Sequence, residues 1–134
     1  MNKLALIAGG LVILAVPAWA HHSAAAIYDV DATFKVDGTI TNVEWMNPHV
    51  RFYVDVKDAA GKVANYEFET TAPGRFLRRG IKSDIFEIGA PITVVAYPAR
   101  DGSLKGDAID VTLANGRKLV GGASDGKEGP EGPP

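Results

Sequence analysis

Residues 50–69 read VRFYVDVKDAAGKVANYEFE, and this stretch decides the fold. Apolar and polar side chains alternate along residues 50–57, and they alternate again along residues 64–69. Such alternation is the pattern of a β-strand with one buried face. Asp58-Ala59-Ala60-Gly61 between the two runs is a short connection, with glycine where a positive φ is needed. The stretch therefore predicts an antiparallel hairpin.

A long strand is expected before the hairpin. Residues 33–45 are rich in β-forming side chains, but the apolar positions follow one parity up to Ile40 and the other from Val43. Since side chains alternate strictly across a pleat, this change predicts a β-bulge near Thr41-Asn42. Asn47-Pro48 then ends the strand.

A short helix is expected after the hairpin. Thr70 or Thr71 can cap its N-terminus, and Pro73 suits its first turn, where no N–H is needed. Phe76 and Leu77 are its expected apolar contacts. Four apolar residues of the following connector are expected to close one end of a barrel: Ile81, Ile85, Phe86 and Ile88.

The last part of the domain reads as two strands, residues 92–97 and 109–113, followed by an Asn115-Gly116 turn and a short return over residues 118–120. Three strands, a helix and two strands, with a long bulged first strand, is the order of the five-stranded Greek-key barrel called the OB-fold. The sequence therefore predicts an all-β, OB-like barrel with one short helix between strands three and four. An open antiparallel sandwich is the alternative.

The N-terminus has the three parts of a secretory signal peptide. A positive start at Lys3 precedes an uncharged apolar run over residues 4–16, and Ala18-Trp19-Ala20 places small residues where a signal peptidase reads. The run is shorter than the roughly 20 residues that span a bilayer. We therefore expect cleavage after Ala20, a periplasmic location and no stable membrane anchor after cleavage.

The chain is expected to divide into four segments. Residues 1–20 are the signal peptide, residues 21–32 an N-terminal extension, and residues 33–120 the barrel domain. Residues 121–134 read GGASDGKEGPEGPP, which is too poor in apolar side chains to offset the entropy of ordering, so a disordered tail is expected.

Composition limits the chemistry that the chain can perform. Its 134 residues include 14 basic and 16 acidic side chains, a formal net charge of −2, and no cysteine. Disulfides, thiolate metal sites and cysteine nucleophiles are therefore excluded. The acidic balance predicts that nucleic acid is not a partner, which leaves a small ligand or a periplasmic protein. No nucleophile or acid–base pair stands in a convincing context, so we do not expect an enzyme.

In two main motifs and several weaker ones, the chain resembles a family of small exported bacterial proteins of unknown function. The main motifs are His21-His22-Ser23 at the expected mature start and Trp45-x-Asn47-Pro48-His49. The weaker ones are Tyr28-Asp29, Gly38-x-Ile40, Gly80-Ile81, Gly89 and the run from Tyr97 to Ser103. The resemblance covers about residues 21–120, and it implies export and a small β-barrel but no activity.

All three histidines of the chain lie in the two main motifs. After cleavage at Ala20, the α-amine and imidazole of His21 can chelate one ion, and His22 or His49 can add a nitrogen. Nitrogen-rich tetragonal sites suit copper(II), so these histidines predict a copper site. The competing interpretation is an unstructured polar terminus and a turn histidine. A ligand role for His49 requires residues 21–32 to fold back along the barrel.

A binding module for a non-metal ligand is the alternative function. Trp45, Asn47, Tyr97 and Arg100 would then form a surface at the barrel mouth for a small ligand, a peptide or a partner protein. Packing at the rim of the core is the competing interpretation of the two aromatic residues.

Overall fold

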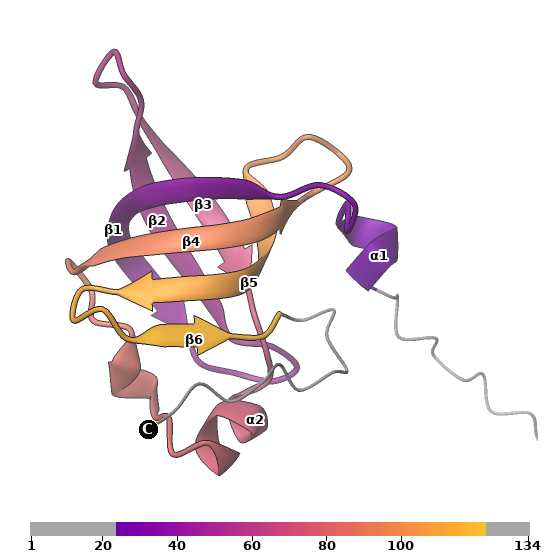
Figure 1. Ribbon diagram of the computed structural model, residues 1–134, viewed down its shortest axis with the longest axis vertical. Coiled ribbons are helices and arrows are strands. Elements are labelled where there is room, and N and C mark those ends of the chain that lie inside the picture. Colours follow the sequence, from indigo (N-terminus) through magenta and orange to yellow (C-terminus); the bar gives the residue numbers. More distant parts are fainter. Residues whose placement is uncertain (1–23, 123–134) are drawn as a thin grey trace, which may run out of the picture.

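The computed structural model describes residues 24–122, which form a six-stranded sheet in the order β3-β2-β1-β4-β5-β6 (Figure 1). The elements are α1 (Ala24–Ile27), β1 (Phe34–Glu44), β2 (Arg51–Lys57), β3 (Val63–Glu69), α2 (Pro73–Arg78), the 3-10 helix η1 (Ser83–Ile85), β4 (Pro91–Pro98), β5 (Lys105–Leu113) and β6 (Lys118–Val120). A parallel pairing of β3 with β5 closes the sheet into a barrel. The predicted OB-like barrel, with its helix between strands three and four, is confirmed.

Strand β1 belongs to both halves of the barrel. Its first half pairs with β4 and its second half with β2, and the register shifts between Ile40 and Asn42. This shift is the bulge that the change of parity predicted. Gly38 lies where β1 crosses β2, and a Cβ atom there would collide with the backbone carbonyl of Asp55. The bulge and the glycine together let one strand bend across the barrel.

Aromatic rings fill the centre of the core. Phe52 on β2 and Phe68 on β3 are fully buried, and their ring centroids lie 5.5 Å apart. Phe86, which follows η1, stacks on Phe52 at 4.9 Å, and Phe76 of α2 meets Phe86 edge-on at 6.1 Å. The helix and the connector therefore plug one end of the barrel, as expected.

The expected threonine cap of α2 is wrong. Ala72 is the N-cap residue, and no side chain caps the helix. Thr70 and Thr71 are buried instead, and the Thr70 hydroxyl donates to the carbonyl of Gly121 at 2.9 Å. Thr70 thus joins the residue after β3 to the chain beyond β6, and the Thr71 carbonyl accepts from the backbone N–H of Val50.

Three further local expectations need correction. Leu77 and Ile88 are 56% and 64% exposed, so neither contributes to the core. Strand β5 begins at Lys105, four residues before the expected start at Ile109, because its first residues pair with both β4 and β3.

The predicted signal peptide, residues 1–20, and residues 123–134 of the predicted tail lie outside the described residues. No helix within residues 24–122 is long and apolar enough to cross a membrane.

Candidate functional site

The N-terminal segment, defined here as residues 24–32, lies against the barrel beside the end of β4 (Figure 1). Tyr28 forms an antiparallel bridge with Ala99, so this segment extends the sheet by one residue pair. Arg100 donates its backbone N–H to the carbonyl of Ile27 at 2.9 Å, and its Nε–H to a second carbonyl of α1 at 3.0 Å. Residues 24–32 therefore fold back along the barrel, whereas residues 21–23, which a ligand role for His49 also requires to fold back, lie outside the described residues.

The side chain of Tyr28 reaches a carboxylate at the end of β3. Tyr28 is 5% exposed, and its hydroxyl donates to Glu69 Oε2 at 2.9 Å. The other oxygen, Glu69 Oε1, lies 2.7 Å from His49 Nδ1. His49 precedes β2, so one carboxylate joins the N-terminal segment to the β1–β2 loop.

The exposure of these groups shows where a ligand can approach. The side chain of Glu69 is 15% exposed, whereas that of His49 is 32% exposed. Glu69 is therefore mostly covered by its partners, and the imidazole is accessible. Because His49 Nδ1 faces Glu69, Nε2 is the ring nitrogen that this contact leaves unused.

Charged side chains surround this site in a ladder across three strands. Glu67 pairs with Lys105 at 2.9 Å and with Arg51 at 3.7 Å, and Arg51 Nη2 lies 3.9 Å from Glu69 Oε1. The alternation on β3 predicts solvent-facing positions for Glu67 and Glu69. The structure corrects this, because their side chains are only 26% and 15% exposed.

A second carboxylate, Asp107 on β5, is fully buried in the same region. Asp107 is the cross-strand partner of both Glu69 and Tyr97. The backbone of Gly122 passes so close that a Cβ atom there would lie 2.6 Å from Asp107 Oδ1. A glycine at this position therefore lets the chain beyond β6 cover the carboxylate.

The electrostatics of the site act on Tyr28. Burial raises the pKa of its hydroxyl well above the ordinary value, and the negative charge of Glu69 raises it further. Loss of the proton would place a phenolate beside this carboxylate. The stabilisation from the Tyr28 contact is therefore fully present below pH ~10, the unfolded pKa, and is lost as pH rises through the higher folded pKa.

We expect a tyrosinate absorbance titration to show a late ionisation that Tyr28→Phe removes. The variant identifies the step, because burial also raises the pKa of Tyr53. If Tyr28→Phe instead removes an ionisation in the ordinary range near pH 10, the buried contact does not exist in solution.

The residues of the predicted ligand surface have separate roles in the structure. The Trp45 ring stacks on Phe76 of α2 at 5.3 Å, which is packing at the rim of the core. Arg100 holds α1, and Tyr97 is the cross-strand partner of Asp107 on β5. Asn47 is exposed in the β1–β2 loop.

Of the three predicted copper ligands, the structure places His49, whereas His21 and His22 lie outside the described residues. Within residues 24–122, no group of three or more histidine, aspartate or glutamate side chains is arranged to hold a metal ion.

Sequence reasoning missed the roles of Tyr28 and Glu69. The Tyr28-Asp29 pair belongs to the motifs quoted above, but nothing local indicates its partner, which is 41 residues away. Glu69 reads as an ordinary polar position of an alternating strand.

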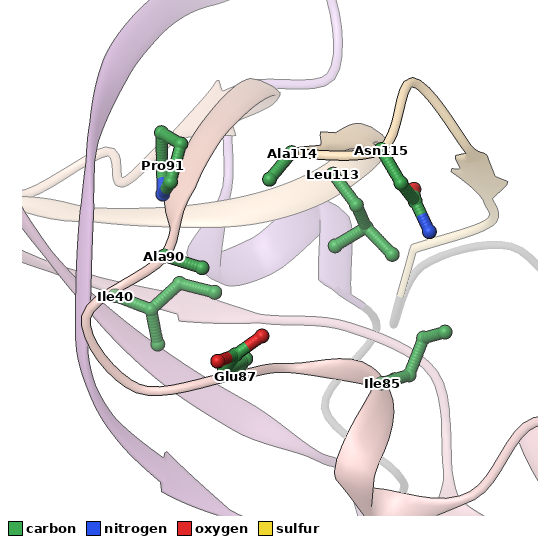
Figure 2. A pocket seen from close by; sticks show the side chains of 8 residues that line it. All are labelled: Ile40, Ile85, Glu87, Ala90, Pro91, Leu113, Ala114 and Asn115. Carbon is green, nitrogen blue, oxygen red and sulfur yellow. The ribbon is translucent and has the colours of Figure 1, made fainter.

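A cavity of about 100 Å³ lies near the β5–β6 turn, on the side of the barrel away from α1 (Figures 1 and 2). Eight residues line it: Ile40, Ile85, Glu87, Ala90, Pro91, Leu113, Ala114 and Asn115. Typical small-molecule sites measure about 300–1,000 Å³, so this cavity is smaller than a typical ligand site.

Comparisons with known proteins give the family of the chain and one similar solved structure. The model of a family described as "Family of unknown function (DUF6152)" matches residues 8–108. No curated protein matches the chain. Among solved structures, a crystal structure of Rim1, a mitochondrial single-stranded DNA-binding protein from S. cerevisiae, is similar at 16% identity and a TM-score of 0.46. The match covers 68% of this chain and 96% of that one.

The similar structure is that of a single-stranded DNA-binding protein, and the expectation that nucleic acid is not a partner of this chain is withdrawn. That expectation rested on the formal net charge of −2. Net charge averages over the whole chain, whereas the field that recruits a polyanion is set by the local distribution of charge. The overall balance therefore does not exclude this class of partner.

Proposed function

The chain belongs to the family of unknown function DUF6152, and on this premise we propose that it is an exported, non-enzymatic protein that binds copper(II). The ligands are the α-amine and imidazole of His21, the imidazole of His22 and the imidazole of His49. The proposed location is a bacterial periplasm, reached through cleavage after Ala20.

One observation supports this proposal above the others. Glu69 contacts His49 through one oxygen and Tyr28 through the other. The segment that follows the two N-terminal histidines and the third histidine are therefore neighbours through a single carboxylate.

The chain between these residues limits how the histidines can meet. Five residues lie between His22 and Tyr28, and four of them form the docked helix α1 (Ala24–Ile27). The hydroxyl of Tyr28 and the ring of His49 are bound to the same carboxyl group. A site that joins His22 to His49 therefore requires the chain before Ala24 to turn back toward this carboxyl group.

The donor set decides the proposed metal. An N-terminal amine has a pKa near 7.7, so it is readily deprotonated at neutral pH and can bind metal together with its own imidazole. Amine and imidazole nitrogens favour copper(II) over the other divalent ions of the first transition row.

Calorimetric titration with copper(II) tests the proposal. The processed protein that starts at His21 is compared with a form that carries one alanine before His21, which turns the α-amine into an amide. We expect the added residue to lower the affinity by more than about tenfold, equivalent to 1.4 kcal/mol. Equal affinity of the two forms would show that the α-amine of His21 is not a copper ligand.

His49→Ala is the second arm of the same titration. A tenfold or larger loss is expected if the barrel histidine is a ligand, and an unchanged affinity leaves only a local chelate of His21 and His22. Absence of copper binding by the processed protein overturns the proposal, and it leaves the barrel as a binding module for another class of ligand.

A further inference from the structure

The carboxylate of Glu69 is occupied on both oxygens by groups from distant parts of the chain. Oε2 accepts from the hydroxyl of Tyr28, and Oε1 faces His49 Nδ1 at 2.7 Å. An ionised carboxylate only accepts hydrogen bonds, so Nδ1 must carry the proton. The neutral imidazole then has its lone pair on Nε2.

We propose that Glu69 is a positioning residue that holds His49 in the Nδ1–H tautomer and so presents Nε2 as a ligand atom. The consequence for metal rests on the proposed function, whereas the tautomer is a property of the metal-free protein. Metal-binding histidines commonly donate the other ring N–H to a carboxylate, which fixes the ring and raises its basicity.

Tyr28 determines which oxygen of the Glu69 carboxylate is left to accept from His49. Its hydroxyl is buried, so it has to donate to an acceptor inside the protein. Glu69 Oε2 is that acceptor, which commits Oε1 to His49. The N-terminal segment and the imidazole thereby share one carboxyl group, so docking of Tyr28 orients the group that holds His49.

This sharing gives Glu69→Gln an unusual expected effect. A glutamine has a single side-chain oxygen, and in the variant we expect that oxygen to accept from the buried Tyr28 hydroxyl at 2.9 Å rather than to face Arg51, whose Nη2 lies 3.9 Å from the Oε1 position. The NH2 group then faces His49 Nδ1 and donates to it, which moves the imidazole proton to Nε2. The substitution is nearly isosteric, yet it removes the lone pair from the ligand atom.

Nitrogen NMR of the metal-free protein, recorded where the imidazole is neutral, measures the tautomer directly. We expect Nδ1–H in the natural protein and Nε2–H in Glu69→Gln. Adding Tyr28→Phe to Glu69→Gln frees the amide to turn its oxygen toward His49, so the double variant should return to Nδ1–H. Glu67→Gln, which changes the neighbouring carboxylate on β3, is the matched control and should leave the tautomer unchanged.

Copper titration of the same variants measures the consequence. Glu69→Gln is expected to lower the affinity by about 10–100-fold, and Glu67→Gln to leave it unchanged. An Nε2–H imidazole in the natural protein, or an Nδ1–H imidazole in Glu69→Gln, overturns the inference whatever copper does. A third outcome separates the two proposals. If the tautomers are as expected but His49→Ala leaves the copper affinity unchanged, the positioning role of Glu69 is supported and the proposed ligand role of His49 is overturned.

Discussion

Replacement of Phe52 by alanine is expected to lower the free energy of unfolding by about 3–5 kcal/mol, the usual cost of removing a buried phenylalanine ring. Phe52 is fully buried between Phe68 and Phe86, with ring centroids 5.5 and 4.9 Å away. Its removal leaves a cavity where the β2–β3 hairpin meets the connector that plugs the barrel. Small domains are stable by only about 5–15 kcal/mol, so this one ring accounts for a large share.

Urea denaturation followed by circular dichroism measures this loss. Leu77→Ala is the control, since Leu77 is 56% exposed on α2 and surface substitutions usually change stability by less than about 0.5 kcal/mol. A loss below about 1 kcal/mol in Phe52→Ala would show that the aromatic stack is not the centre of the core.

The sequence predicts those parts of the fold that depend on the local alternation of apolar and polar residues. The hairpin over residues 50–69 alternates strictly, because one face of β2 and β3 is buried against the stack around Phe52. The bulge in β1 was also predictable, because a change of parity within a strand has few other solutions. These local features, taken in order, were enough to predict an OB-like barrel.

The parts that sequence does not predict are set by contacts between distant residues. Thr70 looks like a helix cap, but its hydroxyl is taken by a carbonyl 51 residues later in the chain. Leu77 is apolar like its neighbour, yet Phe76 lies on the buried side of a helix of only six residues and Leu77 is exposed. At both positions tertiary packing, rather than the local preference of the residue, determines the structure.

The candidate site likewise has one residue that the sequence singles out and others that it does not. The chemistry of imidazole singles out His49 in any sequence with so few histidines. Its partner Glu69 is 20 residues away, and Tyr28 is 41 residues from that glutamate. Only closure of the barrel brings the three together, so the sequence can single out the histidine but not the residues that contact it.

Saturating copper is expected to slow amide exchange in the docked N-terminal segment by up to about a hundredfold. A ligand that binds only the docked state stabilises it by about 2.7 kcal/mol when present at 100 times its dissociation constant. The amides to follow are those of Asp29, which donates to Pro98, and Arg100, which donates to Ile27, since both bonds break when the segment leaves the barrel. Mass-resolved or NMR-detected exchange measures them individually.

Two comparisons decide what the protection means. Gly61 donates to Asp58 in the β2–β3 turn, away from the site, and its exchange should not change with copper if only the N-terminal segment is stabilised. In His49→Ala, copper still binds a local His21-His22 chelate but no longer joins it to the barrel, so the protection of Asp29 and Arg100 should disappear. Equal protection with and without the imidazole would mean that copper stabilises the segment through its own residues, and the bridge between the N-terminus and the barrel would then be wrong.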